Sequence, residues 1–116
     1  MYTLNELMTE ARRLSTKIDE GVQTLAKSAT TLAEAERQYR QEKARLWVET
    51  EATTAAERTV LVDGQSADLR YDRDIAAGLE RAALEALRSR RQQLSAIQSI
   101  LAAHKAEAEH DKYGPN

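Results

Sequence analysis

The sequence predicts an all-α protein in which two long helices form an antiparallel coiled-coil hairpin that oligomerises. Three observations favour this fold. Residues that favour helix dominate the composition, and the 116 residues include 31% charged residues, 4% aromatic residues and one proline. A heptad repeat of apolar residues runs through the first half. A helix-start pattern, Thr54-Ala-Ala-Glu57, then follows the end of that repeat.

The heptad repeat predicts a first helix over about residues 3–49. A repeat of seven residues rather than about 7.2 indicates a left-handed supercoil against a partner helix. The stripe is strongly apolar at first and thins into small residues such as Gly21, Ser28 and Ala35. The residues expected on the seam of this helix are Leu4, Leu7, Leu14, Ile18, Leu25, Leu32, Tyr39 and Leu46.

A second helix is expected from Thr54 to about His110, after a reversal over about residues 50–53. Gly64 is a possible bend, because glycine costs about 1 kcal/mol inside a helix. The apolar pattern resumes beyond it, however, so a single helix is favoured, and residues 111–116 are expected to form a flexible tail. Seam residues expected on this helix are Leu79, Leu87, Leu94, Ile97 and Leu101.

Residues 1–110 are therefore expected to form one helical hairpin. The apolar sector of the second helix also includes Ile75, Ala82, Ala86 and Ile100, and it is wider than one partner helix can cover. Two isolated helices bury too little surface to be stable alone. We therefore expect self-association to cover the rest.

Basic residues gather in two places. Arginines of the second helix occupy the sector opposite its apolar stripe, except Arg90, which points into the stripe. If the chain reverses near residue 51, residues 12–17 lie beside residues 86–91. A second cluster near the end of the first helix includes Tyr39 and Trp47, a mixture typical of single-stranded nucleic-acid binding. The candidate nucleic-acid-binding residues are Arg37, Arg40, Lys43, Arg45, Arg70, Arg73, Arg81, Arg88, Arg90 and Arg91.

The alternative for each cluster is an ordinary solvated face, and repetition of the patch in an oligomer is what favours binding. The net charge of −2 argues against strong global attraction to nucleic acid or membrane. There is no cysteine, glycine-rich phosphate loop or catalytic triad pattern, so we expect no enzymatic activity, no cofactor and no metal site. No leader or membrane-spanning segment is evident, which favours a cytoplasmic protein.

Several short strings, in the same order along the chain, resemble the phage UvsY-type recombination mediators and the small helical hairpin proteins of phage recombination modules. Departures are the short spacing between Thr59 and Tyr71 and the acidic residue Asp72 after that tyrosine. The strings are Lys43-Ala-Arg-Leu46, Thr59-Val-Leu61 with Asp63, Leu69-Arg-Tyr71, Ala86-Leu-Arg-Ser-Arg90 and Ile97-Gln98.

This resemblance implies a cytoplasmic, homo-oligomeric accessory protein of a bacteriophage. Such a protein binds single-stranded DNA and helps to load a recombinase by displacing single-strand-binding protein. By the family pattern, Lys43, Arg45, Arg88 and Arg90 would contact the DNA.

Two other classes of function stay open. The chain could be a coiled-coil adaptor, or a phage inhibitor of a host protein, that acts through protein contacts alone. It could also be a secreted helical hairpin of the Trp-x-Gly type, although Trp47-Val-Glu49 lacks the glycine of that motif.

Overall fold

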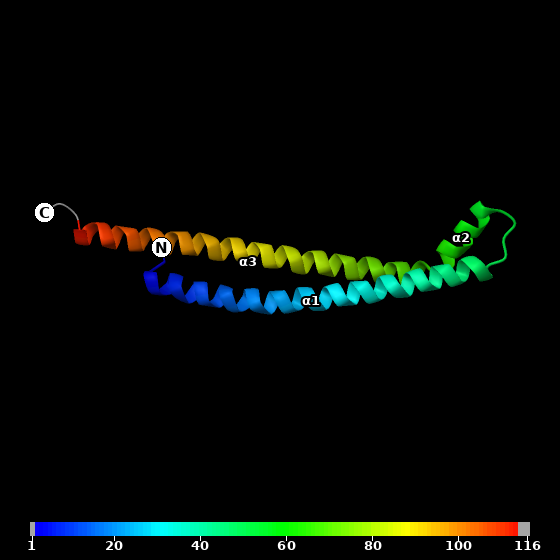
Figure 1. The fold of residues 1–116 in the computed structure, drawn as a ribbon, viewed down its shortest axis with the longest axis horizontal. Coiled ribbons are helices and arrows are strands. Elements are labelled where there is room, and N and C mark those ends of the chain that lie inside the picture. The colour runs from blue at the N-terminus through cyan, green and yellow to red at the C-terminus, as the bar shows by residue number, and fades with distance from the viewer. Residues whose placement is uncertain (1, 114–116) are drawn as a thin grey trace. The chain divides into compact units, whose positions relative to one another are not determined.

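The computed structural model describes residues 2–113, which form three helices and no strand (Figure 1). The helices are α1 (Leu4–Glu49), α2 (Ala55–Gln65) and α3 (Ala67–Tyr113). The predicted all-α class is confirmed. The chain divides into two units, residues 1–23 with 84–116 and residues 24–83, and each is described by itself.

Hydrogen bonds between Thr3 and Glu6 fix the start of α1. The Thr3 hydroxyl accepts a hydrogen bond from the Glu6 backbone N–H at 3.1 Å, and the Glu6 carboxylate accepts one from the Thr3 N–H at 3.0 Å. This reciprocal pair satisfies donors that the first helical turn leaves free. The helix begins at Leu4 and ends at Glu49, against an expected range of about 3–49.

The start of α2 follows the expected pattern only in part. Thr54 is the N-cap in an extended conformation, and its hydroxyl accepts from the Glu57 N–H at 3.1 Å. The Glu57 carboxylate accepts from Thr53 instead of Thr54, with 2.6 Å to the Thr53 hydroxyl and 3.2 Å to its N–H. Two consecutive threonines thus share the capping of one helix.

The prediction of a single helix over residues 54–110 is wrong, because the helix is interrupted at Ser66. Both the Ser66 hydroxyl and its N–H donate to the Val62 carbonyl oxygen, at 2.7 Å and 3.0 Å. Ser66 is buried, and within residues 24–83 α2 leaves the line of α3 at this point (Figure 1). Gly64 lies inside α2 and does not interrupt it. The expected tail is helical to Tyr113, and residues 114–116 lie outside the described residues.

In the unit of residues 1–23 and 84–116, Leu7, Leu14 and Leu87 are buried between α1 and α3. Gly21 also lies in this seam. A Cβ atom added to it would stand 3.2 Å from Leu87 Cδ1 and 3.7 Å from the Arg90 guanidinium. The expected register, with residues 12–17 beside 86–91, is therefore wrong by about two helical turns, because Gly21 is the neighbour of Leu87 and Arg90.

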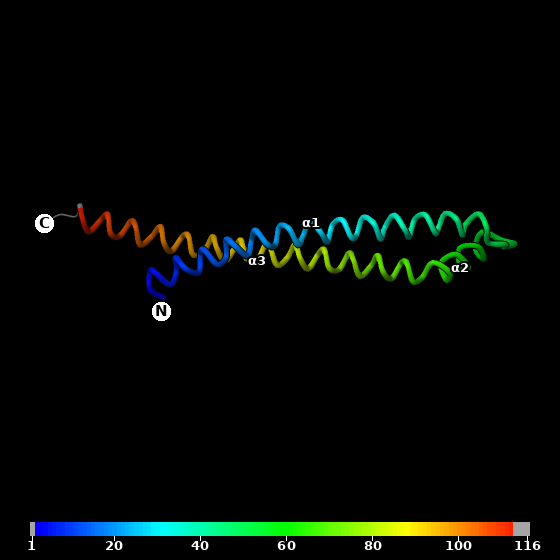
Figure 2. Tube along the Cα trace, turned by 90° about the horizontal axis from the view of Figure 1, so that it is seen from below, coloured from blue at the N-terminus to red at the C-terminus, as the bar shows by residue number. Residues whose placement is uncertain are grey.

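In the unit of residues 24–83, α1 lies beside both α2 and α3 (Figure 2). Tyr39, Leu46, Val62 and Ala76 form its buried apolar core. Long charged side chains cross between the helices here, since Arg73 of α3 lies on the Tyr39 ring of α1 and Lys43 of α1 approaches Asp63 of α2. Polar residues and cations therefore take part in the packing of this unit.

The buried face of α2 and α3 follows its own heptad repeat, with alternating steps of four and three residues. Four of its members are polar, so the pattern of apolar residues in the sequence does not reveal this repeat. All are buried or half-buried: Val62, Ser66, Leu69, Arg73, Ala76, Glu80, Ala83, Leu87, Arg90, Leu94, Ile97 and Leu101.

Two residues expected on the seam lie outside it. Leu4 is 50% exposed and Leu79 is 60% exposed, whereas every other expected seam residue is buried or half-buried. Leu4 is the first residue of α1, where no neighbouring turn covers it. Leu79 lies three residues from the buried Ala76, on the flank of the seam rather than in it. Neither residue is covered within the single chain, so for both a place in an oligomer seam stays a prediction.

Candidate functional site

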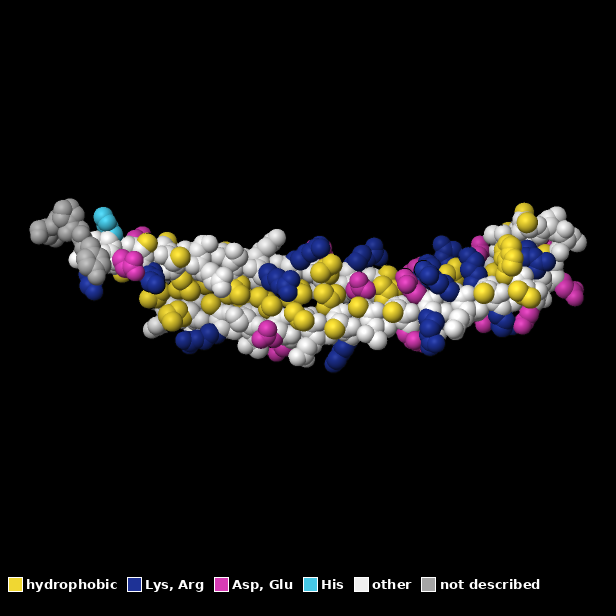
Figure 3. All heavy atoms as spheres, in the orientation of Figure 1, with side chains coloured by type: hydrophobic (Ala, Val, Ile, Leu, Met, Phe, Trp, Pro, Cys, Tyr) yellow, Lys and Arg dark blue, Asp and Glu magenta, His cyan; other side chains and the backbone are white. Residues whose placement is uncertain are grey.

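Four of the ten predicted nucleic-acid-binding residues pair with acids of their own helix, and in three of them the acid lies three or four residues away. Arg37 contacts Glu34 at 2.5 Å and Arg88 contacts Glu85 at 3.1 Å. Arg45 pairs with both Glu42 and Glu49. Basic and acidic side chains accordingly lie close together on the surface (Figure 3). These arginines offer a polyanion little unbalanced charge.

The ion pairs also hold both partners in their charged forms. Hydrogen bonding from the Arg37 guanidinium lowers the pKa of Glu34, and hydrogen bonding from Arg45 lowers the pKa of Glu42. The same contact with Glu42 raises the pKa of Arg45. A phosphate group that recruited either arginine would have to compete with a fixed carboxylate.

Two of the predicted residues, Lys43 and Arg73, surround the ring of Tyr39. The Arg73 guanidinium lies 4.6 Å from the ring centre and the Lys43 ammonium lies 5.7 Å from it. Arg73 also bonds to Asp74 at 2.8 Å, and Lys43 approaches Asp63 at 3.9 Å. Because Tyr39 is buried and covered by cations, it is a seam residue and offers no open ring for a base. The predicted placement of Arg73 opposite the apolar stripe is wrong.

Arg90 takes the seam position expected for it. It is half-buried, and its guanidinium passes next to Gly21, which has no side chain to block it. The aliphatic stem of an arginine can cover apolar surface while its head reaches solvent. Arg90 therefore contributes to packing in its unit.

The remaining four, Arg40, Arg70, Arg81 and Arg91, are exposed as well, and they differ from the others in their lack of partners. None of them forms an ion pair or a side-chain hydrogen bond within residues 2–113. Arg40 and Arg70 belong to the unit of residues 24–83, and Arg91 belongs to the other. These are the side chains whose charge is available to an anionic ligand.

Arg58 is an important residue that the sequence analysis missed. Its guanidinium donates to the carbonyl oxygens of Trp47, at 2.7 Å, and Thr50, and it lies 5.9 Å from the centre of the Trp47 ring. The last turn of α1 contains no basic residue, so a cation of α2 supplies the donors that its free carbonyl groups need. The lack of a basic residue in the last turn of α1 was the feature of the sequence that could have pointed to a cap from another helix.

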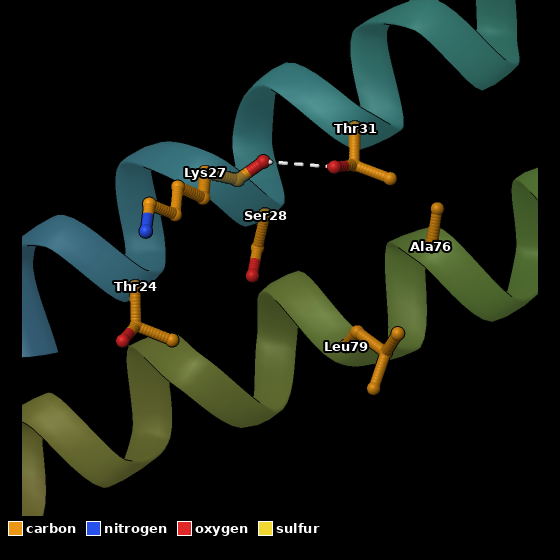
Figure 4. Close-up of a pocket in the computed structure, with 6 residues that line it drawn as sticks. All are labelled: Thr24, Lys27, Ser28, Thr31, Ala76 and Leu79. Carbon is orange, nitrogen blue, oxygen red and sulfur yellow. Dashed lines mark hydrogen bonds between the residues drawn. The ribbon is translucent and has the colours of Figure 1, made fainter.

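An apolar surface remains exposed on α3 within residues 24–83. Tyr71, Ile75 and Leu79 are 66%, 49% and 60% exposed. They border two shallow depressions between α1 and α3, both of which include Thr31 and Ala76. Figure 4 shows one of them, with Ala76 and Leu79 on α3 and the lining threonine, serine and lysine residues on α1.

A separate depression lies in the unit of residues 1–23 and 84–116. Leu7 and Leu14 form its buried side, Ile97 is half-buried, and Tyr2 and Ile100 at its rim are exposed. Hydrophobic side chains gather along this boundary of the two helices in Figure 3. Each unit thus has apolar surface that its own helices do not cover.

Other kinds of site find little support in the described chain. Residues 2–113 contain no group of three or more histidine, cysteine or acidic side chains able to hold a metal ion. None of the helices in that range combines the length and apolar character needed to cross a bilayer. Comparison of the chain with models of protein families, with curated proteins and with solved structures finds no match.

Proposed function

We propose that this chain is a non-enzymatic assembly protein, in which α1 forms an antiparallel hairpin with α2 and α3 and the hairpin associates with copies of itself. The observation that carries the proposal is the exposed apolar surface of Tyr71, Ile75 and Leu79 on α3. Apolar residues that continue along one side of a packed helix are typical of a helix that contacts a further partner.

Contacts inside the two units support the hairpin. Arg73 lies on Tyr39 in one unit, and Leu87 lies against Gly21 in the other. Within residues 24–83, Lys43 lies near Asp63 and Tyr39 lies near Arg73, so residue numbers fall along α1 as those of its neighbours rise, which is the pattern of antiparallel helices. The buried heptads of both helices suit left-handed coiled-coil packing.

Multi-angle light scattering after size-exclusion chromatography tests the proposed assembly. The 13.0 kDa chain should elute with a mass of at least two copies at micromolar concentration, and should dissociate on dilution. A folded monomer at every concentration up to several hundred micromolar would overturn the proposal. Circular dichroism on the same samples establishes that the helices are folded.

A second function, single-stranded DNA binding, is favoured by Arg40, Arg70, Arg81 and Arg91. These exposed cations without acidic partners could neutralise phosphates, and an oligomer would present several sets of them. Together with the resemblance to UvsY-type mediators, they support a phage recombination accessory. It would act in the bacterial cytoplasm and help to load a recombinase where single-strand-binding protein is displaced.

Fluorescence anisotropy with a labelled oligonucleotide tests this second function. We expect micromolar binding that weakens steeply as salt rises. Replacing the four unpaired arginines by alanine should abolish it, whereas Arg37→Ala with Arg45→Ala should change it little, because those guanidinium groups are already paired. Equal losses in both variants, or no binding at low salt, would contradict it.

The adaptor or inhibitor alternative predicts a different result. A tagged chain would retain a stoichiometric host protein after nuclease treatment of the lysate, and the four-arginine variant would retain it equally well. The Tyr71, Ile75 and Leu79 surface would then bind that protein instead of a second copy.

A further inference from the structure

We propose that the surface formed by Ile75, Leu79, Lys27 and Asp72 docks onto the same surface of a second copy. A two-fold axis passes midway between Ile75 and Leu79, and Lys27 of each copy pairs with Asp72 of the other. This inference rests on the proposed self-association and identifies the residues that would carry it. All four side chains lie within residues 24–83.

The positions of the apolar residues suit a two-fold contact. Ile75 and Leu79 are four residues apart on one side of α3, or about 6 Å along the helix. The side chains are 49% and 60% exposed and border depressions that also include Ala76. A two-fold axis midway between them would bring Leu79 of one copy against Ile75 of the other, so the surface is self-complementary.

The charges flanking this surface are complementary under the same operation. Asp72 lies three residues before Ile75, about 4.5 Å along α3, and borders the depression next to Ile75. Lys27 of α1 lies at the opposite end, where it borders the depression next to Leu79 (Figure 4). Rotation about the axis exchanges the two ends, which places each Lys27 beside an Asp72 of the partner.

Neither charge is already engaged. Lys27 and Asp72 make no ion pair within residues 2–113, in contrast to Arg37 and Arg45 of the same unit. Between them, the Thr31 hydroxyl donates to the Lys27 carbonyl oxygen at 3.0 Å (Figure 4). If a second copy covered this surface, the Thr31 hydroxyl would therefore keep its hydrogen-bond acceptor.

Charge reversal tests the pairing. Lys27→Asp and Asp72→Lys should each raise the dissociation constant of self-association about tenfold or more, because each places like charges together twice in the dimer. The double variant, Lys27→Asp with Asp72→Lys, restores opposite charges and should associate nearly as well as the wild type. Arg81→Asp is the control, because it makes the same charge change as Lys27→Asp at an exposed residue outside this surface.

A covalent probe gives an independent measurement. The chain contains no cysteine, so Ile75→Cys introduces a single thiol near the proposed axis. A short bismaleimide should link it efficiently into a dimer, whereas Ala33→Cys, which borders a different depression, should link poorly. Circular dichroism shows whether each variant keeps its helices.

The outcomes separate this inference from the proposed function. If the wild type is oligomeric but single reversals have no effect, or the double variant fails to recover while folded, this surface is not the interface and self-association stands. Selective loss in the single variants with recovery in the double variant supports both. A monomeric wild type overturns both.

Discussion

The Arg58 side chain of α2 donates to the Trp47 carbonyl oxygen of α1 at 2.7 Å and lies over the Trp47 ring. The same guanidinium reaches the Thr50 carbonyl oxygen. One residue therefore ends α1 and ties α2 to it, across a reversal that has no glycine or proline. The geometry suits arginine because its planar head offers several donors in a fixed arrangement.

Arg58→Ala is expected to lower the free energy of unfolding by about 1–2 kcal/mol, because the carbonyl groups at the end of α1 lose charged donors. Arg58→Lys should recover only part of the loss, since an ammonium group lacks the planar arrangement of several N–H donors that a guanidinium group has. Urea unfolding followed by circular dichroism measures both. Unchanged stability in Arg58→Ala would show that water replaces the arginine without cost.

The glycines give a matched pair of substitutions. Gly78→Ala should raise the free energy of unfolding by about 0.5–1 kcal/mol, because a Cβ at Gly78 meets nothing within 4 Å and alanine favours helix. Gly21→Ala should gain less or lose stability, since its Cβ would lie 3.2 Å from Leu87 Cδ1. Thermal unfolding compares them, and equal gains would contradict the close packing at Gly21.

Leu14 and Leu4 both lie on the apolar stripe of α1 but differ in burial, at 1% and 50% exposed. Leu14→Ala should therefore cost about 2–5 kcal/mol, which includes the cavity that it leaves. Leu4→Ala should cost less than about 1 kcal/mol. Chemical unfolding of the two variants measures the difference, and similar losses would mean that Leu4 is covered in the assembled protein.

Glu57 makes stability depend on pH. Hydrogen bonds from the Thr53 hydroxyl and backbone N–H lower the pKa of Glu57 below its ordinary value of 4.5. Its contribution is present above pH 4.5 and is lost as the pH falls through the lowered pKa. Glu57→Gln should lower the midpoint of unfolding at pH 7 and have less effect at pH 3.

The control for that experiment is Glu51→Gln, which replaces an exposed carboxylate without an ion pair or hydrogen bond inside residues 2–113. It should shift the midpoint little at either pH. An effect of Glu57→Gln that is the same at pH 7 and pH 3 would show that the carboxylate charge does not matter.

Part of the charge pattern could have been predicted from the sequence. Glu34 and Arg37, Glu42 and Arg45, and Glu85 and Arg88 are each three residues apart, a spacing that brings side chains together on a helix. Weighing that spacing would have removed three arginines from the candidate interface. The cation pair on Tyr39 could not have been found this way, because Arg73 comes from a different helix.

The break at Ser66 shows a second limit. The sequence pointed to Gly64, where backbone freedom is greatest, but α2 continues through it. At Ser66 the side-chain hydroxyl bonds to the Val62 carbonyl oxygen in addition to the ordinary helical N–H bond, and the residue is buried between the end of α2 and the start of α3. Burial of a small polar residue is a property of its surroundings.

The sequence by itself determined the helical class, the heptad face of α1 and the start of α2 at Thr54, because these depend on periodicity and on contacts a few residues apart. Only the tertiary structure decided the register at Gly21, the seam positions of Arg73 and Arg90, and the cap that Arg58 provides. Each of these depends on a gap, a ring or a free carbonyl group contributed by a distant segment. A polar residue can occupy a buried position where such a partner is present, and no local pattern records it.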